Sequence, residues 1–160
     1  MPEQDPAVPA SITTSRATLD DLDALAFLFD AYRVFYRQRS DFVAARAFLR
    51  ERMQHGESVM FLARDALDGE ALGFTQLYPS FSSVSARRIW ILNDLFVKQR
   101  SRRRGVGQAL MASARAFAVA TGAARLVLET AEDNKPGQAL YESLGYVREH
   151  GTRHYSLELG

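Results

Sequence analysis

Hydrophobic residues recur at three- and four-residue steps in two stretches near the start of the chain, the period of an amphipathic α-helix. The first stretch predicts a helix after Thr18 and the acids Asp20 and Asp21, with inward residues at Leu22, Leu25, Leu28, Phe29, Tyr32 and Phe35. The second predicts a helix from Asp41 to about Gln54, with inward residues Phe42, Ala45, Phe48, Leu49 and Met53. A strand from Ser11 to Arg16 is expected before both helices.

The middle of the chain predicts three strands, at Val59–Arg64, Ala71–Tyr78 and Ile89–Val97. Asp68-Gly69 is a hairpin turn signal between the first two. Pro79 and the serine-rich stretch Ser80–Ser85 predict a loop before the third. That third strand is apolar except for Asn93 and Asp94, and two polar residues inside a buried strand require a chemical reason.

The last third predicts two more helices and three more strands. Arg104-Gly105 opens a helix that ends near Gly122, and Pro136 opens one that runs through Leu144 and stops at Gly145. The strands are expected at Arg125–Thr130, Tyr146–Arg148 and His154–Leu159. The element order, βααβββαβαββ, is that of an α+β domain with a mixed sheet.

Composition narrows the class of protein. The chain has 160 residues, of which 47% are hydrophobic, and this composition fits one compact domain over residues 11–160. Residues 1–10 contain three prolines and two acids, which predict a flexible leader rather than a signal peptide or membrane anchor. The absence of cysteine excludes disulfides and thiol chemistry and makes the cytoplasm the simplest location. A formal net charge of +1 demands neither nucleic acid nor a membrane as partner.

A basic, glycine-containing segment, Arg102-x-x-Gly105-x-Gly107, connects the strand ending at Val97 to the next helix. Free N–H groups and the helix dipole at such a helix start bind anions, and glycines let a pyrophosphate approach the main chain. The spacing matches neither a P-loop nor a dinucleotide fingerprint. The alternatives are glycines that only shape a turn beside solvated arginines, and a nucleic-acid site, which the missing aromatic residues and the nearly neutral chain disfavour.

A second motif, Asn134 followed by Ala139-Leu140-Tyr141-Glu142-Ser143-Leu144-Gly145-Tyr146, completes a family pattern. In this order, the two motifs resemble the GNAT superfamily of N-acetyltransferases over roughly residues 89–148. The segments Gln76–Pro79 and Trp90–Asp94 look similar to the polyamine- and histone-type members. The resemblance implies the GNAT fold, a mixed, mostly antiparallel twisted sheet of about six to seven strands flanked by about four helices, and acetyl-CoA as cofactor.

The resemblance also implies roles for residues of this chain. The backbone of Leu95, Phe96 and Val97 would pair with pantetheine and polarise the acetyl carbonyl. The pyrophosphate would be held by Arg102, Arg103, Arg104, Gly105, Val106, Gly107 and Gln108. Tyr141 would protonate or hydrogen-bond the departing thiolate, and Asn134 would contact the cofactor or nearby backbone. Taken alone, Tyr141 also fits a core aromatic and Asn134 a turn residue.

Acetyl transfer to an amine needs a neutral amine, although a primary ammonium has a pKa of about 10.4. Asp94 is the candidate for removing the proton or orienting a water, and a structural carboxylate is the alternative. Related polyamine-type enzymes have a Glu-Asp pair where this chain has Asn93-Asp94, so an amide occupies the usual position of the base. Glu129, expected on the neighbouring strand, is the reserve candidate.

The acceptor is expected to be a small cationic amine, a polyamine or a lysine side chain. Tyr32, Tyr36, Tyr78 and Asn93 are the candidate acceptor-binding residues, although the aromatic residues of the first helix also fit a core. The strand His154–Leu159 predicts an edge that pairs two chains into a homodimer. His55, His150 and His154 lack further ligands at a convincing spacing, so no metal is expected. The alternatives are a non-catalytic acetyl-CoA sensor and a basic-loop nucleic-acid binder.

Overall fold

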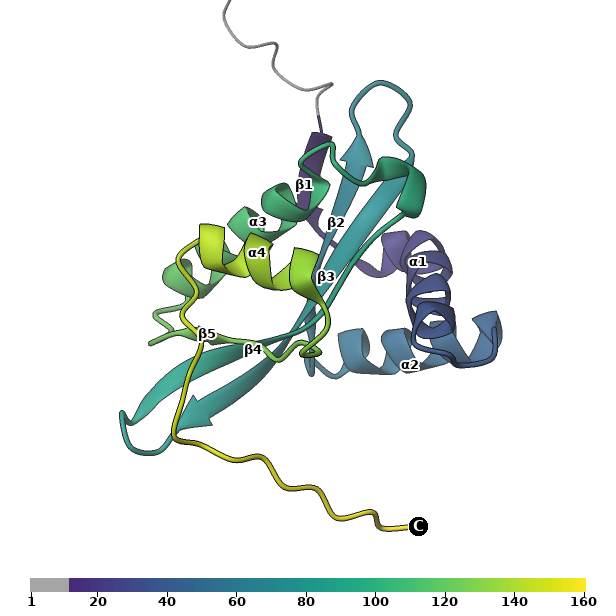
Figure 1. Cartoon of the computed structure of the whole chain (residues 1–160). Coiled ribbons are helices and arrows are strands. Elements are labelled where there is room, and N and C mark those ends of the chain that lie inside the picture. Colours follow the sequence, from purple (N-terminus) through teal and green to yellow (C-terminus); the bar gives the residue numbers. More distant parts are fainter. Residues whose placement is uncertain (1–11) are drawn as a thin grey trace, which may run out of the picture. The chain divides into compact units, whose positions relative to one another are not determined.

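The structure, a computed structural model, describes residues 12–160 and forms two compact units, the first ending at Leu128 and the second covering Glu129–Gly160 (Figure 1). The predicted leader and Ser11 lie outside the described residues. The first unit contains β1 (Ile12–Arg16), α1 (Leu22–Phe35), α2 (Phe42–Gln54), β2 (Val59–Asp65), β3 (Ala71–Ser82), β4 (Arg87–Val97), α3 (Val106–Ala120) and β5 (Leu126–Val127). The second contains α4 (Lys135–Ser143).

The first unit is built on a five-stranded sheet in the order β1-β2-β3-β4-β5. The first four strands are antiparallel to their neighbours, and β5 is parallel to β4 because α3 provides the crossover between them. Helices α1 and α2 lie on one side of the strands and α3 on the other (Figure 1). The predicted α+β fold and the order of its first nine elements are therefore confirmed.

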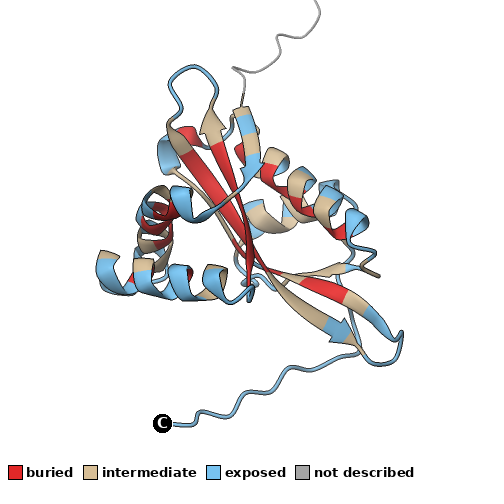
Figure 2. Cartoon of the chain, turned by 180° about the vertical axis from the view of Figure 1, so that it is seen from behind, coloured by how far each residue is buried: buried red, intermediate tan, exposed pale blue. Residues whose placement is uncertain are grey.

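Helices α1 and α2 form where the sequence provides both a cap and a hydrophobic stripe. Thr18 and Asp21 form a capping box before α1, and the Asp41 carboxylate accepts from the Ala44 N–H at 2.9 Å at the start of α2. The helices and strands share one core cluster, in which the most buried side chains are Leu25, Leu28, Leu49, Leu62 and Phe74. Figure 2 shows this burial along the central strands.

Two residues expected to face inward are exposed instead. Phe35 is the last residue of α1, where its ring meets Tyr36 at 5.3 Å and lies 5.7 Å from the Arg102 guanidinium. Phe48 stacks on Phe29 with the ring centroids 5.7 Å apart, and the Arg52 guanidinium lies over the Phe48 ring at 4.9 Å. Both rings contact neighbouring side chains but remain exposed to solvent.

Strand β3 is longer than predicted and includes Pro79. Pairing of β3 with β2 ends at Leu77, whereas pairing with β4 continues to Ser82. Pro79 lacks an N–H, so it is tolerated where no neighbouring strand needs that donor. The predicted serine-rich loop is consequently reduced to the tip of a β3–β4 hairpin.

The strands predicted at Tyr146–Arg148 and His154–Leu159 are wrong, because these segments form no strand in the structure. The fifth predicted strand is also shorter, since β5 covers only Leu126–Val127 rather than Arg125–Thr130. A strand requires a neighbouring edge for its N–H and C=O groups. Within residues 12–160, no strand pairs with these segments, and the sheet has five strands instead of six to seven.

Candidate functional site

Strand β4 carries a bulge at the two polar residues that interrupt its hydrophobic pattern. Gln76 pairs with Asp94 and the next residue, Leu77, pairs with Leu92, so Asn93 is the extra residue. Because the bulge turns its side chain outward, Asn93 is exposed, and the expectation that both polar residues lie inside is wrong for Asn93. Asp94 is 4% exposed.

The buried Asp94 carboxylate is surrounded by hydrogen-bond donors. Gln76 Nε2 donates to Oδ2 at 2.7 Å, and Asn93 Nδ2 donates to Oδ1 at 3.2 Å. The main-chain oxygen of Asp94 accepts from Thr75 Oγ1 at 2.8 Å. The two amide donors, Gln76 and Asn93, compensate the cost of burying the carboxylate and hold it in one orientation.

Two of the tyrosines predicted to bind the acceptor lie beside this carboxylate. Burial raises the pKa of Tyr32, and the charge of Asp94 and a hydrogen bond to it raise this pKa further. Burial and the charge of Asp94 also raise the pKa of Tyr78, to about 12. Both phenols are therefore protonated donors at neutral pH. Tyr36 is 55% exposed and meets the Tyr32 ring edge-on at 4.9 Å.

One edge of β4 is left unpaired beyond the bulge. Pairing with β5 covers only Trp90 and Ile91, and no strand among residues 12–160 joins this edge along Leu95, Phe96 and Val97. Their main-chain groups on this edge make no ladder hydrogen bonds. An extended ligand can use such an edge by adding main-chain hydrogen bonds.

The basic loop after β4 opens α3 with a left-handed turn. Arg103 has φ 63° and Gly105, the N-cap residue, has φ 80°. No side chain caps the helix, so the N–H groups at its start are available to an anion. Just before this loop, β4 packs closely against β3. Gly73 of β3 allows this close packing, because a Cβ at Gly73 would lie 2.6 Å from the Phe96 carbonyl oxygen.

The arginines of the loop have different partners. Arg104 pairs with Asp65 of β2 at 2.9 Å, and this guanidinium lowers the pKa of the Asp65 carboxyl. Arg102 Nε donates to the Val97 carbonyl at 3.2 Å. Arg103 is exposed and has no ion-pair partner among residues 12–160. Val106 is buried, whereas Gly107 and Gln108 are accessible in the first turn of α3.

The second unit contains the remaining predicted residues. Asn134 is the N-cap of α4, where its Oδ1 accepts from the Gly137 N–H at 3.2 Å and its Nδ2 donates to Thr130 at 2.9 Å. Tyr141 lies on α4, half-buried, with its ring 6.1 Å from that of Tyr146. Glu129 is exposed, lies outside β5 and sits 3.0 Å from His154 Nδ1, so its predicted place on a strand is wrong.

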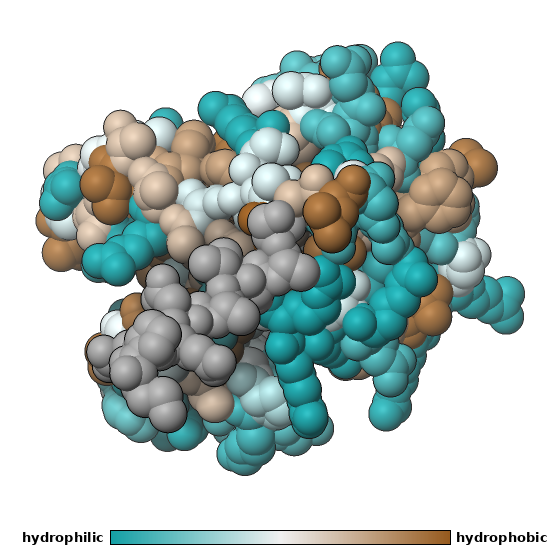
Figure 3. All heavy atoms as spheres, turned by 90° about the horizontal axis from the view of Figure 1, so that it is seen from above, coloured by the Kyte–Doolittle hydropathy of each residue, from teal (hydrophilic) through white to brown (hydrophobic). Residues whose placement is uncertain are grey.

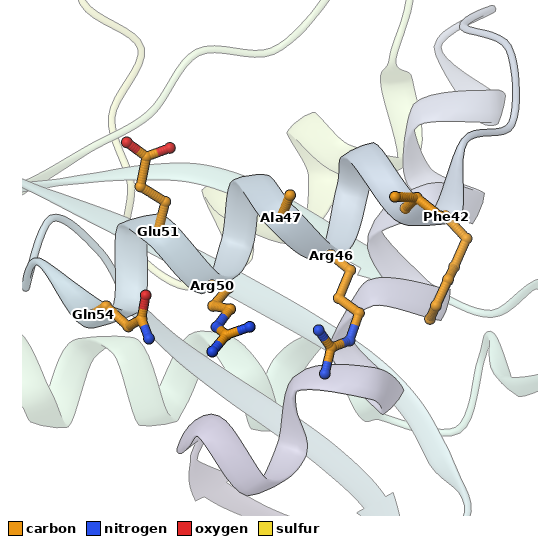
Figure 4. A pocket seen from close by; sticks show the side chains of 7 residues that line it. Phe42, Arg46, Ala47, Arg50, Glu51 and Gln54 are labelled. Carbon is orange, nitrogen blue, oxygen red and sulfur yellow. The ribbon is translucent and has the colours of Figure 1, made fainter.

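Two shallow hollows of the first unit lie away from Asp94. One, of about 660 Å³, lies between α1 and the loop after β4. The other follows α2, where Arg46 and Arg50 point to one side and Glu51 to the other (Figure 4). Neither is lined by Asp94. On the face that Figure 3 shows, hydrophilic and hydrophobic side chains are interspersed.

No cluster of three or more metal-ligating side chains occurs in the described part of the chain. No helix within residues 12–160 has the length and hydrophobicity needed to span a membrane.

Comparison with known proteins identifies the class that this fold and site define. The acetyltransferase (GNAT) family matches residues 22–146, and the chain belongs to this family. It is 46% identical over 144 residues to the uncharacterized N-acetyltransferase YhfO of Bacillus subtilis, covering 90% of this chain and 95% of that protein. A probable acetyltransferase of Haemophilus influenzae is 34% identical over 139 residues, which cover 87% of this chain and 92% of that protein. A crystal structure of a probable acetyltransferase matches with a TM-score of 0.88 and 41% identity. The match covers 92% of this chain and 98% of the chain in that structure.

The chain is therefore an acetyltransferase of a family that normally uses acetyl-CoA. Sequence reasoning missed two residues that contact the candidate site residues Asp94 and Arg104. Gln76 is fully buried against Asp94, and its signal was a polar residue at an inward position of β3, two residues after Phe74. Asp65, the partner of Arg104, had no signal, because the two residues are 39 positions apart.

Proposed function

We propose that the chain transfers an acetyl group from acetyl-CoA directly to a primary amine, carried by a small cationic molecule such as a polyamine or by a lysine side chain. One observation carries the proposal, namely the order of three features along the chain. The bulge of β4 holds a buried carboxylate, the strand beyond the bulge has one unpaired edge, and the loop after the strand leads to the start of α3, which no side chain caps. A carboxylate, a main-chain edge and an anion cradle thus follow one another along 14 residues, from Asp94 to Gly107.

The residues after the bulge fit acetyl-CoA. The free edge of Leu95, Phe96 and Val97 offers main-chain groups to pantetheine, and a main-chain N–H there would polarise the acetyl carbonyl. The left-handed turn at Gly105 and the first N–H groups of α3 suit a pyrophosphate, together with the main chain from Arg102 to Gln108. Arg103 adds an accessible charge, whereas Arg104 holds the loop to β2 through Asp65.

When bound, acetyl-CoA supplies the thioester from which the acetyl group departs. Asp94 would accept a proton from the amine, directly or through a water, because its carboxylate is fixed and charged beside the acceptor tyrosines. Tyr32, Tyr36 and Tyr78 would surround the amine of the acceptor. The exposed amide of Asn93 would contact the acceptor at the solvent side of this site. Glu129 remains the reserve base. The amine nitrogen gains the acetyl carbon, and the sulfur leaves with the electron pair of the broken bond.

Tyr141 would give the departing sulfur a proton or a hydrogen bond, and Asn134 would order the start of the helix that carries it. A phenol with a pKa of about 10 is protonated at neutral pH and is suited to this step.

We further propose a cytoplasmic homodimer without a metal or nucleic-acid partner. The C-terminal segment supports the dimer, because Tyr155, Leu157 and Leu159 alternate with polar residues and are 89%, 82% and 91% exposed. An alternating segment with exposed hydrophobic residues is suited to pairing with the edge of another chain.

The test is amine-dependent thiol release from acetyl-CoA, with spermidine, lysine, a histone-tail peptide and an aminoglycoside as acceptors. Wild type is compared with Tyr141→Phe and Asp94→Asn, and each variant is expected to lower kcat about 100-fold or more if its proton transfer is lost. Acetyl-CoA binding without release by any amine would favour the sensor alternative. Absence of acetyl-CoA binding would refute the proposal.

A further inference from the structure

The face of the sheet under α1 and α2 contains buried polar atoms that the fold itself does not satisfy. Within residues 12–128, Gln76 Oε1 and Ser58 Oγ are buried side-chain atoms without a hydrogen-bond partner, whereas Arg52 Nε, which also lacks one, forms an ion pair with Glu57 Oε1 at 3.4 Å. Most buried polar atoms in proteins are hydrogen-bonded, and each exception needs an explanation. Leaving such an atom unpaired is costly, so the two atoms on one face indicate a place where a ligand supplies the missing partners.

The sheet register places Gln76 and Ser58 close together. Met60 of β2 pairs with Gln76, and Gln76 pairs with Asp94 of β4, so the three lie side by side across the sheet. Ser58 immediately precedes the last β2–β3 pair, Val59 with Leu77, and therefore adjoins Tyr78. Side chains two residues apart on a strand share a face, which puts Ser58 and Tyr78 on the same face as Gln76.

Tyr32 of α1 covers this face. Its ring lies 5.9 Å from Phe74 and 6.2 Å from Phe96, which flank the Gln76–Asp94 pair along β3 and β4. The effect of the Asp94 charge on the pKa of Tyr32 and of Tyr78 agrees with this arrangement. Aromatic rings therefore border the pair of polar side chains.

The orientation of the Gln76 amide follows from its partner. Its Nε2 lies 2.7 Å from Asp94 Oδ2, and the flipped amide would direct an oxygen at a carboxylate oxygen, which is repulsive. The Oε1 atom is therefore the one without a partner. It can only accept a hydrogen bond, and its side chain is 0% exposed.

We infer that Gln76 is a positioning residue for the acceptor: its Oε1 and the Asp94 carboxylate together accept N–H groups of a primary alkylammonium. This inference rests on the proposed function and names the group that its acceptor site takes. A primary ammonium carries three N–H donors, so it can bond Gln76 and Asp94 at once and retain one for a water or Tyr78. The surrounding rings favour a cation over a neutral group.

The experiment titrates butylammonium chloride into the chain at constant ionic strength, by calorimetry, and compares Gln76→Leu with Gln76→Glu. Both variants lose the Nε2 donor to Asp94, but only the glutamate keeps an oxygen that can accept from the ammonium. We expect Gln76→Leu to weaken binding about tenfold and Gln76→Glu to bind at least as tightly as wild type. Thr14→Val is the control, because it removes a hydrogen bond to Ser113 in the same unit and should leave binding unchanged.

Equal weakening in both Gln76 variants would mean that the residue acts only through Asp94, and this overturns the inference. Unchanged binding in Gln76→Leu, or no saturable binding to wild type, overturns it as well. Acetyl-CoA is titrated separately into the same proteins and is expected to bind all of them alike. If wild type does not bind acetyl-CoA, the proposed function is refuted. The comparison of butylammonium binding between the Gln76 variants would still test the inference separately.

Discussion

Replacing Gly105 with alanine tests the proposed anion-binding loop most sharply. Gly105 has φ 80°, and a Cβ there would meet only Gln108 Oε1, at 3.7 Å, so the substitution adds backbone strain without a clash. A left-handed conformation costs an L-residue about 1 kcal/mol or more. If the loop keeps its conformation, we expect Gly105→Ala to lower the free energy of unfolding, measured in urea, by about 1 kcal/mol. If the loop relaxes instead, we expect the variant to bind acetyl-CoA about fivefold more weakly, because about 1 kcal/mol of binding free energy corresponds to that change in affinity.

Gly122 provides a matched control at the other end of α3. It has φ 70° and nothing within 4 Å of a built Cβ, so Gly122→Ala carries the same strain away from the loop. We expect it to destabilise the chain similarly while leaving the acetyl-CoA Kd, measured by calorimetry, at the wild-type value. The reasoning fails if both variants weaken acetyl-CoA binding equally, or if Gly105→Ala loses neither stability nor affinity.

Three further expectations concern charge and packing. Tyr78 should titrate at about 12 in tyrosinate absorbance, and its contribution to stability, present below pH 10, should be lost as pH rises through 12. Burial is the larger cause of the raised pKa and the Asp94 charge the second, so Asp94→Asn should lower this pKa in part, and an unchanged value would contradict the contribution of Asp94. Because the pKa of Asp65 is lowered, chiefly by the Arg104 side chain, its contribution to stability should be present above about pH 3.8 and lost as pH falls through its folded value. Acid titrations should show a smaller loss in Arg104→Gln than in wild type, because only the backbone hydrogen bonds from Leu67 and Asp68 then remain to lower this pKa, and an equal loss would contradict the role of Arg104. Gly73→Ala should lower the free energy of unfolding by about 1–3 kcal/mol in urea, and an unchanged midpoint would refute the tight approach to Phe96.

Local signals in the sequence predicted the helices well. A cap and a hydrophobic period lie within one segment, so Asp41 and the stripe ending at Met53 identify α2 without any knowledge of its neighbours. The hairpin of β2 and β3 followed in the same way from Asp68-Gly69. The left-handed loop at Gly105 and the helix that it opens were also predictable locally, because the glycines and the helix are adjacent in the chain.

Features that depend on two distant segments were not predictable. The bulge at Asn93 exists only in the register of β4 against β3, and it decides which of two polar neighbours is buried. The segment His154–Leu159 has a strand pattern, but a pattern does not supply the edge that a strand must pair with. The unpaired Oε1 of Gln76 likewise follows from tertiary packing alone.

The most direct test of the central claim is to identify the product. The chain is incubated with acetyl-CoA and each amine of the panel, and mass spectrometry is used to detect the acceptor together with released thiol. We predict at least one amine that gains a single acetyl group on nitrogen, in a one-to-one ratio with free coenzyme A thiol, and only in the presence of the chain. Thiol release without an acetylated amine, or no release with any amine, would contradict the account.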